Sequence, residues 1–192
     1  MRRSSLPLAL AAALIPVAAL AHTGPGAHTG FMAGLEHPVS GQDHVLAMVA
    51  VGLWAAMAGG RALWALPVAF VLGMVLGGGM GFAGLPLPGV EPMILASIII
   101  LGVLAAMAAR LPVALSAAIC LGFGVFHGHA HGAEGPGTGM LVYAAGFVAA
   151  TMALHLGGIA LGLGLTRLGG RVAARIAGAA AAVAGALLAM GG

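Results

Sequence analysis

The sequence predicts an all-α protein, a polytopic membrane bundle of about six transmembrane helices behind a cleavable N-terminal signal peptide. Of its 192 residues, 61% are hydrophobic and 6% are charged, whereas a soluble domain has about 25% charged residues. The 34 glycines suit helices that pack closely in lipid. Patterns such as Gly73-x-x-x-Gly77 and Gly158-x-x-x-Gly162 suit contacts within one bundle or between chains.

Residues 1–21 have the features of a secretory signal peptide. They combine two N-terminal arginines, a short apolar segment and a small-x-small cleavage sequence, Ala19-Leu20-Ala21, in the order typical of such signals. We expect the mature chain to begin at His22, with residues 22–192 forming a single transmembrane domain. The alternative is an uncleaved first helix, which the short apolar segment and its prolines disfavour.

The apolar segments after the signal peptide define the expected helices. The first covers residues 31–58 and is interrupted by a polar section in which Pro38 and Gly41 predict a helix break. The further segments each approach the roughly 20 residues that cross a bilayer. They are 62–82, 92–109, 111–126, 140–165 and 172–190.

Charged residues assign the ends of these segments to two sides of the membrane. The connections expected on one side carry arginine: Arg61, Arg110, Arg167 and Arg171. The connections on the other side contain Glu91 and Glu134 and no arginine or lysine. The positive-inside rule therefore predicts a multi-pass protein of the bacterial inner (cytoplasmic) membrane with a periplasmic mature N-terminus. The arginines are too scattered to indicate nucleic-acid binding.

A polar section at residues 37–44 stands at the start of an apolar run, where ionisable groups are functional candidates by default. On a continuous helix, His37, His44 and Met48 share one stripe, and Asp43 lies on the neighbouring face. If the proline and glycine of this section instead open the backbone, the same groups can still converge on one cation. A third interpretation is that Asp43 only caps the helix, which leaves the imidazoles unexplained.

A second histidine-rich tract follows the segment 111–126 and is expected at the same, external face. On a helix, His127, His131 and Glu134 share a face and His129 points away, whereas a glycine-rich loop would gather all three rings. Such tracts indicate metal binding, and imidazole suits nickel, copper, zinc and iron. The alternative is a solvated, pH-sensitive loop.

Other candidate ligands lie outside these two tracts. His155 is deep in segment 140–165, where it serves either as a relay for a metal ion or as a partner in an interhelical hydrogen bond. Cleavage after Ala21 would place a terminal amine beside the imidazole of His22, a pair that can chelate a metal. Because Cys120 is the single cysteine, any metal site here uses nitrogen, oxygen or thioether ligands.

Two motifs, in order along the chain, resemble those of the HupE/UreJ family of small bacterial nickel or cobalt permeases, which are often associated with hydrogenase or urease maturation. They are His37-Pro38-x-x-Gly41-x-Asp43-His44 and Phe126-His127-Gly128-x-Ala130-His131-Gly132-x-Glu134. The resemblance covers essentially the whole chain. It implies that His37, Asp43 and His44, with His127, His131 and Glu134, carry metal recognition and passage, whereas His129 fills a variable position.

The leading hypothesis is a secondary-type permease that takes up Ni²⁺ or Co²⁺ from periplasm to cytoplasm, without a prosthetic group, and supplies hydrogenase or urease maturation. A phosphate-binding P-loop motif is missing from the sequence, so this chain is not expected to hydrolyse ATP. The main alternative is a non-transporting metal-binding accessory or sensor protein. A b-haem electron-transfer protein would need two facing histidines at similar depth. An enzyme is disfavoured because the sequence lacks H-E-x-x-H and G-x-S-x-G motifs.

Overall fold

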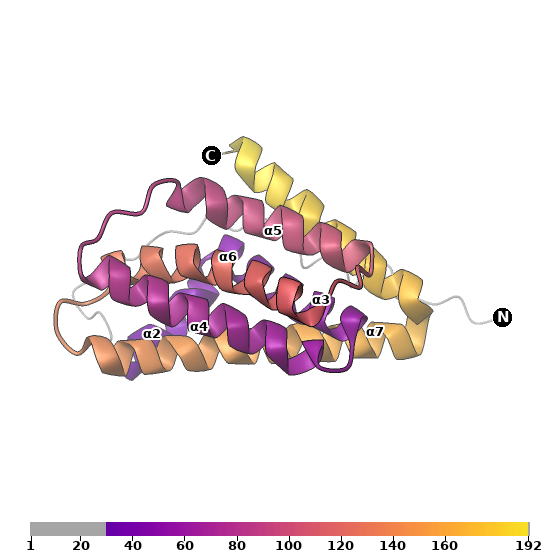
Figure 1. The fold of residues 1–192 in the computed structure, drawn as a ribbon, viewed down its shortest axis with the longest axis horizontal. Coiled ribbons are helices and arrows are strands. Elements are labelled where there is room, and N and C mark those ends of the chain that lie inside the picture. The colour runs from indigo at the N-terminus through magenta and orange to yellow at the C-terminus, as the bar shows by residue number, and fades with distance from the viewer. Residues whose placement is uncertain (1–29, 192) are drawn as a thin grey trace.

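The computed structural model describes residues 30–191, so the expected signal peptide and His22 lie outside the described residues. The described chain is helical and contains no strand. Its elements are α2 (Phe31–Ser40), α3 (Gln42–Ala58), α4 (Ala62–Phe82), α5 (Val90–Ala106), α6 (Val113–Glu134) and α7 (Met140–Gly191). Figure 1 shows α3 to α6 and the first arm of α7 running roughly side by side.

The first apolar segment is broken as predicted. Helix α2 ends at Ser40, Gly41 is extended with φ −95° and ψ 120°, and α3 begins at Gln42. Pro38 lies buried within α2, where it removes one backbone hydrogen bond and weakens the end of the helix. A single continuous stripe through His37, His44 and Met48 is therefore not formed, and the opened backbone is the correct alternative.

Helices α4 and α6 are joined by glycines on both sides of their interface. A Cβ atom on Gly77 would collide with the carbonyl oxygen of Val125, and one on Gly128 would collide with that of Met74. The glycines in these contacts recur every four residues: Gly73, Gly77 and Gly81 on α4, and Gly124, Gly128 and Gly132 on α6. This spacing keeps them on one face of each helix, so the two backbones approach closely.

A second close contact joins α3 to α7. A Cβ atom on Gly52 would collide with the carbonyl oxygen of His155, and one on Gly158 with that of Val49. Trp54 of α3 is fully buried, and its Nε1 donates a hydrogen bond of 3.0 Å to the Ala109 carbonyl. The glycine pairs noted in the sequence thus make contacts within this chain.

The number of membrane crossings is only partly settled by the helices. Three of them, α4, α6 and α7, are long and apolar enough to cross a membrane, while α3 and α5 are shorter apolar helices. Helix α7 contains a non-helical residue, Gly170, with φ 73° and ψ 176°. Its second arm turns back along α5 in Figure 1. The crossing count of about six stays a prediction.

The boundaries of α6 differ from those expected. The segment 111–126 continues as helix to Glu134 and begins at Val113, because the glycines of the histidine-rich tract pack against α4 instead of forming a loop. The tract is therefore helical, which selects between the two arrangements left open by the sequence.

Candidate metal centre

Imidazole rings from three helices meet at one end of the bundle. The ring of His131 on α6 lies 4.7 Å from that of His37 on α2 and 4.3 Å from that of His44 on α3, measured between ring centroids. The ring of His127, one turn earlier on α6, lies 4.9 Å from that of His44. The two tracts predicted to share a membrane face are therefore in contact.

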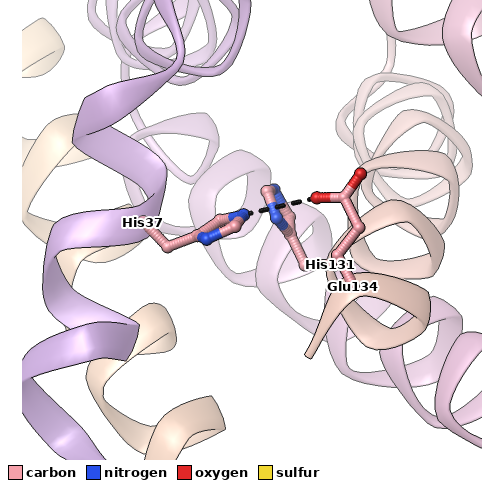
Figure 2. Close-up of side chains that lie close together, drawn as sticks. All are labelled: His37, His131 and Glu134. Atoms are coloured by element: carbon pink, nitrogen blue, oxygen red, sulfur yellow. Dashed lines mark ion pairs between the residues drawn. The ribbon is translucent and has the colours of Figure 1, made fainter. Parts of the chain in front are cut away.

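The most exposed part of this cluster contains three groups that can hold an ion together. One ligand atom each from His37, His131 and Glu134 lie within 4.8 Å of one another, and His37 Nε2 is 3.6 Å from Glu134 Oε2. Figure 2 shows His37 pointing from α2 toward His131 and Glu134. Ligands of one ion lie about 3 Å apart, given metal–nitrogen bonds of about 2.1 Å, so a small approach completes the site.

The imidazole of His44 is oriented by the residue before it. Asp43 Oδ1 lies 2.8 Å from His44 Nδ1 and accepts a 2.8 Å hydrogen bond from the His44 backbone N–H. Because a carboxylate only accepts, Nδ1 carries the hydrogen and Nε2 keeps its lone pair. His44 Nε2 is buried without a hydrogen-bond partner among the described residues. A carboxylate behind a histidine in this way is typical of metal sites.

The same contact decides how far the capping interpretation of Asp43 holds. Its carboxylate does accept a backbone N–H in the first turn of α3, where negative charge is favourable. The residue that precedes the helix is Gly41, however, and no side chain caps it. Asp43 therefore both satisfies the helix start and orients His44.

His127 is oriented by a serine from α5. Ser97 Oγ donates a 2.6 Å hydrogen bond to the Ile94 carbonyl and lies 2.9 Å from His127 Nε2. A hydroxyl has one hydrogen, so Ser97 accepts from His127 Nε2–H and leaves the lone pair on Nδ1. His127 is fully buried, and its Nδ1 has no hydrogen-bond partner in the described part of the chain.

His131 occupies the centre of the cluster. It is 4% exposed, and neither ring nitrogen has a hydrogen-bond partner within residues 30–191. Its ring packs 4.2 Å from that of Phe147 on α7. Most buried polar groups are hydrogen-bonded. An imidazole that lies between other imidazoles, with neither ring nitrogen hydrogen-bonded, is therefore suited to act as a ligand of a metal ion.

The remaining candidates lie elsewhere. His129 faces away, as expected for a helix, and its Nε2–H donates a 2.7 Å hydrogen bond to the Leu85 carbonyl. Met48 is fully buried in the hydrophobic core. His155 on α7 is fully buried, with its ring 5.2 Å from that of Phe70. His22 lies outside the described residues.

Two residues near these histidines were not identified from the sequence. Ser97 is the single hydroxyl group in the apolar segment 92–109, and a polar side chain in a membrane span is a signal that could have identified it. Phe70 contacts the rings of both His127 and His155. One phenylalanine in an apolar run carries no comparable signal.

The side chains of this cluster could hold a divalent transition-metal ion. It combines neutral imidazole nitrogens with carboxylate oxygens, which suit such ions. The rings of His44, His127 and His131 are in direct contact, so a porphyrin does not fit between them. The fold and this cluster together define a helical membrane protein with a group of candidate metal-binding side chains at one end.

Comparison with known proteins gives the family. The family model described as HupE / UreJ protein matches residues 10–188. The chain is 47% identical over 197 residues to "Protein HupE" of Rhizobium leguminosarum bv. viciae, with 100% of both chains covered. No solved structure matches. This chain belongs to the HupE/UreJ family, which is associated with nickel and cobalt uptake for hydrogenase or urease.

Proposed function

We propose that this protein is a permease that takes up Ni²⁺ or Co²⁺ from the periplasm into the cytoplasm across the inner membrane. The observation that carries the proposal is the convergence of His37, His131 and Glu134. Family membership supports the class of ion, and the arginine pattern supports the direction from a periplasmic cluster to the cytoplasm. Supply of hydrogenase or urease maturation is part of the same proposal.

The exposure of the ligands supports capture followed by inward transfer. The side chain of Glu134 is 62% exposed, that of His37 is 33% exposed and that of His44 is 12% exposed. His131 and His127 follow at 4% and 0%. An ion that meets the carboxylate first can exchange water for imidazole in steps, which lowers the barrier to dehydration.

The membrane potential provides a driving force without ATP. An inside-negative potential favours inward movement of a divalent ion by about 4 to 5 kcal/mol per 100 mV. The cluster then has to bind the ion tightly enough for selection and weakly enough for release.

The test is uptake of radioactive nickel into proteoliposomes that contain the purified protein and carry an inside-negative potential. Saturable accumulation that vanishes when the potential is abolished would support the permease. Saturable binding at the outer surface without accumulation would instead identify a metal-binding accessory or sensor protein. Protein-free liposomes give the background.

A further inference from the structure

His155 and Thr151 form a polar pair in the apolar interior of the bundle. Both residues belong to α7, lie four positions apart and are fully buried. Residues at this spacing share one face of a helix. Neither ring nitrogen of His155 has a hydrogen-bond partner among residues 30–191, and the Thr151 hydroxyl also has none there.

The lack of partners is unusual for each of these groups. A threonine inside a helix commonly donates its hydroxyl hydrogen to the carbonyl four residues earlier, and Thr166 of the same helix does so to Gly162 at 2.7 Å. Buried polar atoms without partners are rare because they have lost their contacts with water. Three such atoms on one helical face therefore indicate a site for something polar.

Phe70 connects this pair to the metal centre. Its ring lies 5.2 Å from that of His127 and 5.2 Å from that of His155. The contact with His155 is edge-on, with an angle of 86° between the ring planes. An ion that leaves His127 toward the interior therefore meets this aromatic ring and then His155.

We propose that His155 and Thr151 form an inner station for the transported divalent ion, separated from the outer cluster by the ring of Phe70. The ion takes one imidazole nitrogen and the threonine oxygen as ligands and keeps part of its water shell. This pair contains no carboxylate, so the ion is held less tightly here than in the outer cluster. The inference rests on the proposed transport function and adds a second binding site to it.

The experiment compares three variants of the full protein in lipid nanodiscs and proteoliposomes. His155→Asn removes the imidazole, Thr151→Val removes the hydroxyl at nearly constant shape, and Thr166→Val is the matched control because its hydroxyl already has a partner. Equilibrium dialysis with Ni²⁺ alone counts the binding sites, and radioactive nickel measures the initial rate of uptake.

We expect a weaker class of Ni²⁺ sites in the wild-type protein that is missing from His155→Asn, with the tighter class unchanged. Uptake should fall at least about tenfold in His155→Asn, the lower end of the effect of removing groups that support a metal. It should fall about fivefold in Thr151→Val, an effect the size of one lost neutral polar contact, here that of the hydroxyl oxygen with the ion. Thr166→Val should match the wild type.

Two results would overturn the inner station. One is wild-type uptake and wild-type site number in both His155→Asn and Thr151→Val. The other is a lower melting temperature with an unchanged number of Ni²⁺ sites, which would mean that His155 holds only water or supports packing. If His155→Asn does not fold, the same comparison of Thr151→Val with Thr166→Val decides.

Failure of the proposed function would give a different result. If proteoliposomes that contain the wild-type protein do not accumulate nickel at all, the proposed permease function is wrong. A weaker class of sites that disappears in His155→Asn would then still support the inner site as a binding site. If the wild-type protein takes up nickel and the uptake rates of the variants equal its rate, the proposed permease function is supported and the inner station is wrong.

Discussion

His44 and His127 of the outer cluster differ from His155 in the hydrogen bonds that their rings make. His44 has the Asp43 carboxylate at 2.8 Å, and His127 has the Ser97 hydroxyl at 2.9 Å. Both ring nitrogens of His155 lack such a partner in the described residues. A supporting hydrogen bond fixes the tautomer and aims one lone pair. The rings of His44 and His127 are therefore each held in one tautomer, whereas His155, like His131, offers either nitrogen.

The two levels also differ in charge. Asp43 and Glu134 contribute carboxylates to the outer cluster, whereas the ring of His155 packs against that of Phe70. Carboxylates attract a divalent cation before it loses its water. The comparison therefore supports the proposal of ion selection at the outer end and brief occupancy in the interior, and the predictions below test that proposal.

The largest effect is expected from His131→Asn. His131 is the ring shared by the exposed ligands and the buried ones, so its loss interrupts both. Nickel uptake into proteoliposomes should fall about 100-fold, the upper end of the effects seen at metal sites. His129→Asn is the control, because that ring bonds the Leu85 carbonyl outside the cluster. Equal losses in both variants would contradict the structure of the site.

Asp43→Asn should reduce uptake by about 10- to 100-fold, as expected when the group behind a metal-binding histidine is altered. The amide oxygen can still accept the His44 backbone N–H and preserve the start of α3, but its negative charge is lost. A melting temperature near that of the wild type would show that the bundle is intact. Unchanged uptake would return Asp43 to a purely structural role.

Lower external pH should weaken metal capture by the outer cluster. A protonated imidazole has no lone pair for a metal, and burial disfavours the charged form of a histidine. Uptake should therefore fall on the acidic side, as the pH is lowered below the ordinary histidine value of about 6.5. The measurement uses matched free nickel and membrane potential at a series of pH values. Unchanged uptake across the pH at which the cluster histidines protonate, followed by NMR, would exclude neutral imidazoles as the capturing ligands.

The smallest effect is expected from Ser97→Ala. It leaves His127 in place but removes the oxygen that accepts from its Nε2–H, so the ring is free to take the other tautomer. Uptake should fall about fivefold, as for one lost hydrogen bond. Ser97→Thr keeps the hydroxyl and should restore most of the rate. If Ser97→Thr is as impaired as Ser97→Ala, the effect reflects packing instead of orientation.

The sequence was sufficient for the helical class, the break near Gly41 and the meeting of the two histidine tracts. Each followed from a strong local signal: apolar composition, a helix-breaking pair and a consistent charge pattern. The sequence could not choose between a helix and a loop for residues 127–134. Glycine permits both conformations, and the deciding contact is with α4, far away along the chain.

The hydrogen bonds that orient the rings of the candidate ligands could not be predicted from the sequence. Ser97 reaches His127 across a separation of 30 residues, and nothing local to either residue indicates the pairing. The contact of Asp43 with its neighbour was also not visible in the sequence. Asp43 was predicted as a candidate metal ligand, and the structure shows one of its oxygens bonded to the His44 ring.

The glycine contacts between α4 and α6 restrict which helices of this protein can move relative to one another. Backbones that touch at Gly77 and Gly128 have no side chains between them to repack, so we expect α4 and α6 to move together. Contacts of the same kind join α7 to α2 at Gly34 and to α3 at Gly52, so α2, α3 and α7 form a second group of helices. In the proposed transport cycle, the site would then open and close by relative motion between these two groups, each of which carries two of its histidines.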